Sequence, residues 1–134
     1  MKGVFTMKLS LTSEAASKLT PLFDDPDSIV LLDYGDGNGF LAEGKTECTL
    51  NQAFRILIVH KDCDFHEYNQ NLATSLGNFY YKDYTKMFMD DEMTIKLNPH
   101  DQQLSLHGKY RGVITANLKI LDYRNQENNN RYHL

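Results

Sequence analysis

A short apolar run followed by three closely spaced glycines is the feature that most limits how this chain can fold. Residues 29–32 read Ile-Val-Leu-Leu, a run long enough for a buried strand and too short for a typical helix. Soon after come Gly35, Gly37 and Gly39. Because glycine adopts backbone conformations that other residues avoid, this spacing indicates positive φ or a close backbone approach. The sequence therefore predicts an early strand that ends in a glycine-rich turn.

The glycine-rich turn does not have the spacing of a phosphate-binding loop. Its Gly-x-Gly-x-Gly pattern differs from the dinucleotide fingerprint, and no helix is predicted after it to direct an N-terminus at a phosphate. It also lacks the Gly-Lys-Ser/Thr ending of a Walker A loop. Asp33, Asp36 and Asn38 offer oxygen ligands for calcium, but the spacing and the distal glutamate of an EF-hand are absent. The pattern favours a plain tight turn or a β-bulge.

Hydrophobic periodicity predicts one helix near the start of the chain. Residues 7–11 alternate between apolar and polar, as a half-buried strand does. Apolar residues at helical spacing follow, with Thr12 or Ser13 as the N-cap. Glu14 lies in the first turn, where the helix dipole favours a carboxylate. The acidic, proline-containing stretch 24–27 ends this helix.

The rest of the chain is typical of short β-strands. Residues 53–60 carry apolar side chains on both faces, which predicts a strand in the middle of a sheet. Turns are predicted at Asn98-Pro99 and between Gly108 and Gly112. Alternation and aromatic content predict further strands at residues 78–84, 86–89, 93–97, 104–106 and 114–120.

Together these elements predict an α+β fold with one early helix and roughly six to eight strands. We expect a mostly antiparallel or mixed β sandwich or pseudo-barrel that carries one N-terminal helix. The expected organisation is an N-terminal extension over residues 1–6, a single domain over residues 7–122, and a polar, disordered tail over residues 123–134.

Charge and hydropathy exclude several classes of protein. The 134 residues include 18 acidic and 14 basic side chains, for a formal net charge of −4, without the basic stripe of a nucleic-acid-binding protein. No apolar stretch approaches the roughly 18 residues of a transmembrane helix, and the first residues lack the apolar core of a signal peptide. We therefore expect a cytoplasmic protein that binds neither nucleic acid nor a membrane.

Two histidines and two cysteines form the candidate metal site. His60, Cys63 and His66 follow a His-x-x-Cys-x-x-His pattern, and imidazole and thiolate are ligands of zinc and iron. A structural zinc site needs four ligands, and Cys48 is available as the fourth. The alternative is that the histidines belong to an ordinary polar loop and that both thiols are buried or incidental in a reducing compartment.

No local signature supports an enzyme. Cysteine–histidine pairs are assembled in space rather than in sequence, and the chain has no nucleophile elbow, so we expect a protein without catalytic residues. The tyrosine-rich segment, with Tyr80, Tyr81 and Tyr84 beside Tyr68, offers either a recognition surface or part of the sheet core. The second interpretation is favoured.

Several stretches carry a resemblance to a known family. They are Met-Lys-Leu-Ser-Leu-Thr-Ser-Glu-Ala-Ala at residues 7–16, the strand that enters the glycine turn, Phe-Arg-Ile-Leu-Ile-Val at residues 54–59, and the segments 87–90 and 93–99. This pattern resembles the HesB/IscA-like family of iron–sulphur cluster biogenesis domains. The resemblance covers residues 7–122.

The resemblance implies a β-rich fold with a helix and, in part of the family, binding of iron or an iron–sulphur cluster at a dimer or higher interface. The family ligands are one cysteine in the glycine-rich turn and two in a C-terminal Cys-Gly-Cys. This chain has no cysteine at either place, so an iron or cluster cofactor would lack those ligands. Cys48 is the better thiol candidate because it follows the glycine turn by about ten residues. The implied partners are iron–sulphur assembly proteins or a second copy.

Two functions compete at this point. One is a divergent iron–sulphur cluster biogenesis protein with a weak metal site at Cys48, Cys63, His60 or His66. The other is a protein-binding module on the same scaffold that holds no metal. The absent cysteine triad slightly favours a member that has lost its ligands.

Overall fold

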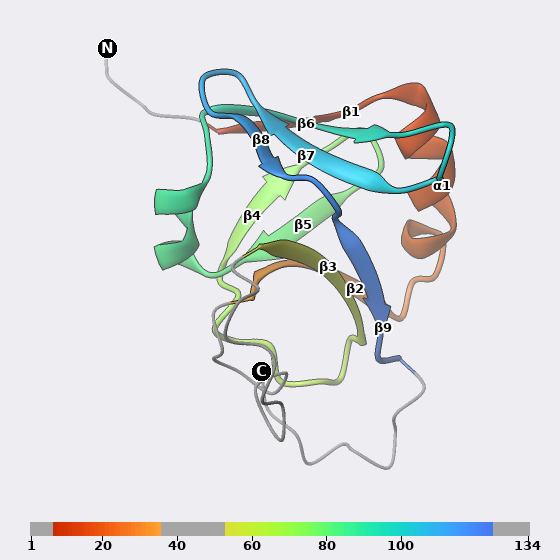
Figure 1. Ribbon diagram of the computed structural model, residues 1–134. Helices are drawn as coiled ribbons and strands as arrows, with labels where there is room; N and C mark the ends of the chain where they lie inside the picture. Colours follow the sequence, from red (N-terminus) through yellow and green to blue (C-terminus); the bar gives the residue numbers. More distant parts are fainter. Residues whose placement is uncertain (1–6, 36–52, 125–134) are drawn as a thin grey trace, which may run out of the picture.

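Two mixed β-sheets and one helix make up the part of the chain that this computed structural model describes, residues 7–35 and 53–124 (Figure 1). The four-stranded sheet has the order β1 (Lys8–Leu11), β6 (Glu92–Leu97), β7 (Leu104–Gly108) and β8 (Gly112–Thr115). The five-stranded sheet has the order β4 (Gln70–Ala73), β5 (Asn78–Tyr81), β2 (Ser28–Tyr34), β3 (Phe54–His60) and β9 (Lys119–Asp122).

Both sheets contain parallel and antiparallel neighbours. β1 pairs in parallel with β6, and the other neighbours of that sheet are antiparallel. In the larger sheet, β2 and β3 are antiparallel, whereas β2 with β5 and β3 with β9 are parallel. The described residues form an open sandwich rather than a closed barrel. The predicted α+β class with mixed sheets is confirmed.

The helix α1 (Ser13–Phe23) begins where the sequence predicts it. The side chain of Thr12 accepts a hydrogen bond from the backbone N–H of Ala15 at 3.3 Å, which satisfies one of the free donors of the first turn. Ala15 and Leu19 are fully buried and join the core between the sheets. Within the described residues, no helix combines the length and apolar character needed to cross a bilayer.

Replacing Thr12 with alanine is expected to lower the free energy of unfolding by about 1 kcal/mol, because the N–H of Ala15 would lose its acceptor. Thr12→Ser keeps the hydroxyl and is the matched control, with a loss well below that of Thr12→Ala. Urea unfolding followed by circular dichroism measures both. Equal losses for the two variants would contradict the capping role.

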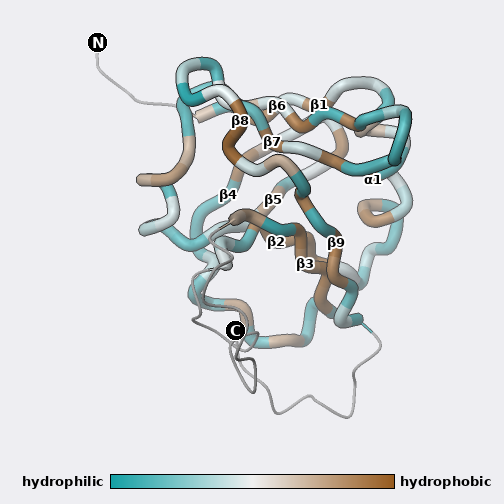
Figure 2. Tube along the Cα trace, in the orientation of Figure 1, coloured by the Kyte–Doolittle hydropathy of each residue, from teal (hydrophilic) through white to brown (hydrophobic). Residues whose placement is uncertain are grey.

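The central strands β2 and β3 are buried on both faces. One face of these strands joins the main core with Val30, Leu32, Phe54, Ile56 and Ile58. Leu31, Leu57 and Val59 point to the opposite, outer face, where they pack with Tyr68. Figure 2 shows both strands among the hydrophobic segments of the chain. The prediction that residues 53–60 form a central strand is confirmed by its place between β2 and β9.

The prediction of a strand at residues 86–89 is wrong, and the strand predicted over residues 78–84 ends at Tyr81 as β5. The chain forms the 3-10 helix η3 (Asp83–Phe88) in its place. Local hydrogen bonds favour the helical turn, because the Thr85 hydroxyl donates to the carbonyl of Lys82 at 2.7 Å. Lys86 forms an ion pair with Asp83 at 3.0 Å on the same turn. Aromatic content had favoured a strand, and these local contacts override it.

The prediction of one strand over residues 114–120 is also wrong, because the segment forms two strands in different sheets. β8 pairs with β7, and β9 pairs with β3. The Thr115 hydroxyl accepts a hydrogen bond from the backbone N–H of Phe54 at 3.0 Å, which joins the two sheets at the crossing. Residues 70–73, which had no clear pattern, form β4. The described residues therefore contain nine strands, more than the six to eight predicted.

Two predicted turns are present. Asn98 accepts a hydrogen bond from the N–H of His100 at 2.8 Å in the turn between β6 and β7. Gly108 and Gly112 are opposite each other at the turn between β7 and β8, and Gly112 has φ of 72°. The extension over residues 1–6 and the tail beyond residue 124 lie outside the described residues.

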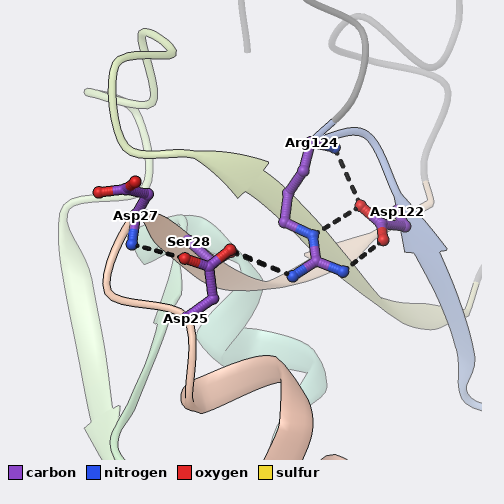
Figure 3. Close-up of polar contacts among 5 residues, drawn as sticks. All are labelled: Asp25, Asp27, Ser28, Asp122 and Arg124. Atoms are coloured by element: carbon purple, nitrogen blue, oxygen red, sulfur yellow. Dashed lines mark hydrogen bonds and ion pairs between the residues drawn. The ribbon is translucent and has the colours of Figure 1, made fainter.

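An arginine fixes the end of β9 to the segment that follows α1 (Figure 3). Arg124 donates to both carboxylate oxygens of Asp122, from Nε at 3.0 Å and from Nη2 at 2.6 Å. Its Nη1 lies 3.5 Å from Asp25 Oδ2 and 3.3 Å from Ser28 Oγ. The hydrogen bonds to Arg124 hold the pKa of Asp122 below its ordinary value, so they stabilise the ionised form of Asp122.

Candidate functional site

The outer face of the five-stranded sheet contains a buried polar cluster near the end of β2, two residues before Gly35. Asp33 near the end of β2 is the cross-strand partner of Arg55 near the start of β3. The pleat places Asp33 on the same face as Leu31, so its carboxylate lies among apolar side chains. Tyr68, from the segment between β3 and β4, covers it. We call Asp33, Arg55 and Tyr68 the Asp33 cluster.

Every oxygen of the Asp33 carboxylate has a donor. The Tyr68 hydroxyl donates to Oδ1 at 2.5 Å. Arg55 approaches Oδ2 with Nε at 2.9 Å and Nη2 at 2.8 Å. Only 4% of the Asp33 side chain is exposed, against 20% for Arg55, so the ion pair is largely shielded from water. Both carboxylate oxygens of Asp33 are therefore occupied by donors of the protein and are not available as the calcium ligands that the sequence offered.

Burial controls the protonation of this cluster. Desolvation raises the pKa of Asp33, and the Tyr68 hydrogen bond and the Arg55 charge oppose that rise. Burial and the neighbouring Asp33 charge raise the pKa of Tyr68, so its hydroxyl stays protonated and donates. A second cation, Lys82, lies 5.1 Å from the centre of the Tyr68 ring. The cluster holds a neutral tyrosine and a paired carboxylate, which suits a structural anchor better than proton transfer.

The Asp33 cluster anchors the strand that leads into the glycine-rich turn. Gly35, the first glycine of that turn, is buried, and its N–H donates to the carbonyl of Ala53 at 2.8 Å. This bond continues the pairing of β2 with β3 beyond the Asp33–Arg55 pair. Gly37 and Gly39 lie outside the described residues.

The structure places the three described residues of the predicted metal site at the end of β3 and on the loop that follows it. His60 ends β3, and its Nδ1 accepts a hydrogen bond from the N–H of Asp62 at 3.1 Å. Cys63 is half-buried and packs against the outer-face cluster of Leu31, Leu57, Val59 and Tyr68. His66 is exposed, and its Nδ1 lies 2.7 Å from Asp64 Oδ1.

Each histidine is engaged with a neighbouring aspartate. The hydrogen bond that His66 donates to the Asp64 carboxylate raises the pKa of His66, and a metal would have to displace that proton or use Nε2 of the neutral ring. Among residues 7–35 and 53–124, no three His, Cys, Asp or Glu side chains are grouped to hold a metal ion. Cys48 lies outside these residues, so the site that combines Cys48 with Cys63, His60 and His66 stays a prediction.

The sequence patterns did not single out the Asp33 cluster. A signal was present, since Asp33 and Arg55 are the charged residues inside two otherwise apolar strands. Pairing them requires the register of β2 with β3, and a sequence pattern alone does not fix it. The prediction that the tyrosine-rich segment belongs to the sheet core is confirmed in part. Tyr68 and Tyr81 are buried, and Tyr84 is 44% exposed.

The comparisons with known proteins agree with the resemblance drawn from residues 7–16 and 54–59. A model of the iron–sulphur cluster biosynthesis family matches residues 7–122. The chain belongs to this family. Its membership of the iron–sulphur cluster biosynthesis family connects it, in general terms, with cluster biogenesis. No curated protein matches the chain.

Two crystal structures are similar to this member of the iron–sulphur cluster biosynthesis family. One is of a candidate Fe-S biosynthesis protein from Lactobacillus salivarius, described as having a novel fold. It is 43% identical with a TM-score of 0.80, and the match covers 88% of this chain and 99% of that one. The other is of a candidate Fe-S biosynthesis protein from Lactobacillus acidophilus, at 17% identity and a TM-score of 0.59, covering 87% and 90%. The second likeness shows the fold alone.

Proposed function

We propose that this chain serves iron–sulphur cluster biogenesis in the cytoplasm as a non-enzymatic protein that binds other assembly proteins. The observation that carries the proposal is a family match over residues 7–122 in a chain with only two cysteines. A cluster normally takes four cysteine ligands. One copy supplies two at most, so this chain is poorly equipped to carry a cluster alone.

The described part of the molecule supports a binding role. Its polar groups at the Asp33 cluster are satisfied within the protein, and His60 and His66 each have a local hydrogen bond. The scaffold presents free strand edges and shows no grouped metal ligands within the described ranges. Neither nucleic acid nor a membrane fits a chain with a net charge of −4 and no basic stripe.

Anaerobic reconstitution with iron and sulphide tests this proposal. We expect no cluster absorbance in the visible range that depends on Cys48 or Cys63, so wild type and the Cys48→Ser/Cys63→Ser double variant give the same spectrum. The same double variant is expected to capture the same iron–sulphur assembly proteins from native host extract as the wild type. If neither the wild type nor the double variant captures more assembly proteins than the affinity tag alone, the proposal is overturned.

A weak iron or cluster site is the second candidate, and one observation favours it. Cys63 is half-buried and lies three positions from both His60 and His66 in the chain, and a homodimer would supply four thiols. Cluster absorbance in the wild type that disappears in Cys48→Ser or Cys63→Ser would establish this function in place of the first.

A further inference from the structure

A groove with a volume of about 360 Å³ lies beside β9, on the side of the molecule that carries α1. Figure 1 shows β9, α1 and the turn between β6 and β7 around this place. α1 contributes Lys18, the turn contributes Gln102 and Gln103, and the chain entering β9 contributes Asn117 and Lys119. The volume falls within the range of about 300–1,000 Å³ that is usual for ligand sites.

One wall of the groove is an edge of β9 that pairs with no other strand of the described residues. β9 pairs with β3 on one side, where Tyr123 donates its N–H to the carbonyl of Ile58 at 2.8 Å. Backbone groups alternate along a strand, so Ile120 directs its N–H and C=O away from β3. Leu118 does the same, and its N–H donates to the carbonyl of Leu104 at 2.7 Å. Beyond this bond, no described strand pairs with the outer edge of β9.

The polar lining of the groove is cationic or neutral. Lys18 and Lys119 both line it, and neither forms an ion pair with a described residue. The other polar side chains are the carboxamides of Gln102, Gln103 and Asn117, and no carboxylate from residues 7–35 or 53–124 lines the groove. This local charge contrasts with the net charge of −4 of the whole chain. The groove therefore complements an acidic ligand.

The acidic residues next to the groove along the chain, Asp101 and Asp122, each have a hydrogen-bond partner. Asp122, which follows the groove on β9, is bound by Arg124, and the same guanidinium lies against Asp25 (Figure 3). Asp101, beside the carboxamides, accepts a hydrogen bond from the N–H of Gln103 at 3.0 Å. Arg124 thus neutralises charge that would otherwise repel an acidic ligand at the end of the edge.

Apolar side chains complete the lining. Leu104 and Leu118 are each only 2% exposed, and they border the groove together with Ile120 and Leu121. An extended peptide presents its side chains alternately to two sides, so it can place acidic groups on the side of Lys119 and apolar groups on the side of Leu118 and Ile120. A strand edge and two lysines that have no partner among the described residues, together with an apolar wall, are the parts of a strand-addition site.

We infer that the groove beside β9 binds an extended segment of a partner protein in which acidic and apolar residues alternate. The segment adds a strand to the outer edge of β9, with its carboxylates at Lys18 and Lys119. This inference rests on the proposed partner-binding function and names the surface and the partner chemistry for it.

A titration of the full chain with a defined probe tests the inference. The probe is an acetylated and amidated hexapeptide of alternating glutamate and valine, followed by amide chemical shifts. We expect shifts centred on residues 102–104 and 117–121, and binding weakened about tenfold or more in Lys18→Gln/Lys119→Gln. Lys8→Gln removes a lysine of β1 outside the groove and is expected to bind like the wild type. No binding of this probe, or equal affinity in the double variant, would overturn the inference.

Two further probes identify what the groove recognises. A hexapeptide of alternating lysine and valine has the same extended tendency with opposite charge, and we expect it not to bind. Free glutamate supplies the carboxylates without a strand, and we expect it to bind at least about tenfold more weakly than the acidic peptide. Binding of the basic peptide, or of glutamate as tightly as the acidic peptide, would refute strand addition by an acidic segment.

Failure of this inference is distinguishable from failure of the proposed function. If the acidic peptide does not bind but the full chain still captures assembly proteins from extract, partner binding stands and the groove is excluded as its site. If the peptide binds and Lys18→Gln/Lys119→Gln also loses those assembly proteins, both are supported. Retention of the thermal midpoint in the double variant confirms that the lysines act on binding rather than on folding.

Discussion

Replacing Arg55 with glutamine is expected to lower the free energy of unfolding by about 3 kcal/mol at pH 7. The reason is that the variant leaves Asp33 buried with its charge no longer paired, and breaking a buried ion pair from one side typically costs about 3–5 kcal/mol. The lower end of this range applies because Arg55 is 20% exposed and water reaches part of the pair. Urea unfolding measures the loss.

The same variant has a characteristic pH dependence. Burial raises the pKa of Asp33 above the unfolded value of 3.8, so the folded state holds this proton more tightly than the unfolded chain. The ionisation of Asp33 therefore lowers the free energy of unfolding as the pH rises above that value. Arg55 lowers the pKa of Asp33, so its removal raises that pKa further and makes this loss of stability at high pH larger. We expect the difference between wild type and Arg55→Gln to be largest at pH 7 and to shrink as the pH falls toward 4.

Two variants separate this interpretation from a general loss of packing. Tyr68→Phe keeps the ring and removes only the hydroxyl that donates to Asp33, with an expected loss of about 1.5 kcal/mol. Asp33→Asn/Arg55→Gln removes both charges and is expected to be more stable than Arg55→Gln at pH 7. A pH-independent difference for Arg55→Gln, or a double variant less stable than the single one, would show that the unpaired carboxylate is not the cause.

The sequence identified those elements whose pattern is local. Thr12 and the apolar spacing behind it were sufficient to predict α1, because a cap and a helical face involve residues close in sequence. β3 was predicted as central because apolar side chains occur on both of its faces, and the structure buries both. Mixed strand directions needed the tertiary structure, since parallel neighbours such as β3 and β9 are far apart in the chain.

The errors share a physical cause. Apolar alternation runs through residues 114–120 without interruption, although the chain moves from one sheet to the other near Thr115. Ile114, Leu118 and Ile120 all pack in the same core, so the two-residue period continues across the change of sheet, although Ala116 between them is exposed. At residues 83–88, Thr85 and the Asp83–Lys86 ion pair stabilise a helical turn that aromatic content does not reveal.

The candidate site was the least predictable feature. The spacing of His60, Cys63 and His66 indicated ligand types, but the structure turns each histidine toward an aspartate two residues away. The Asp33 cluster joins residues separated by 22 and 35 positions, so no spacing rule could have found it. The groove beside β9 likewise depends on where α1 and the turn before β7 meet the strand edge. Polar sites of this kind are set by the fold rather than by local sequence.

Replacing Phe54 with alanine is expected to lower the free energy of unfolding by about 4 kcal/mol, the largest loss among the single variants considered. Phe54 is 1% exposed, and its ring meets that of Tyr34 edge to face at 5.0 Å. Tyr34 in turn stacks on Phe88 of η3 at 4.2 Å, so the cavity would open beneath the strand end that leads into the glycine-rich turn. Since the chain has no tryptophan, circular dichroism in urea measures unfolding, and the near-ultraviolet tyrosine signal reports the loosened Tyr34.

A graded series tests whether lost packing is the cause. Phe54→Leu leaves a smaller cavity and is expected to cost about 1.5 kcal/mol, and it stays measurable even if Phe54→Ala does not fold. Val113→Ala trims a side chain that is 58% exposed near the same aromatic residues and should change stability by less than about 0.5 kcal/mol.

The effects of Phe54→Leu and Tyr68→Phe should add, because the two side chains act through separate contacts. Phe54 packs against Tyr34 on one face of β2 and β3. Tyr68 donates to Asp33 on the opposite face. Strong coupling between them would instead mean that both faces of β2 and β3 respond to one movement of the strand end.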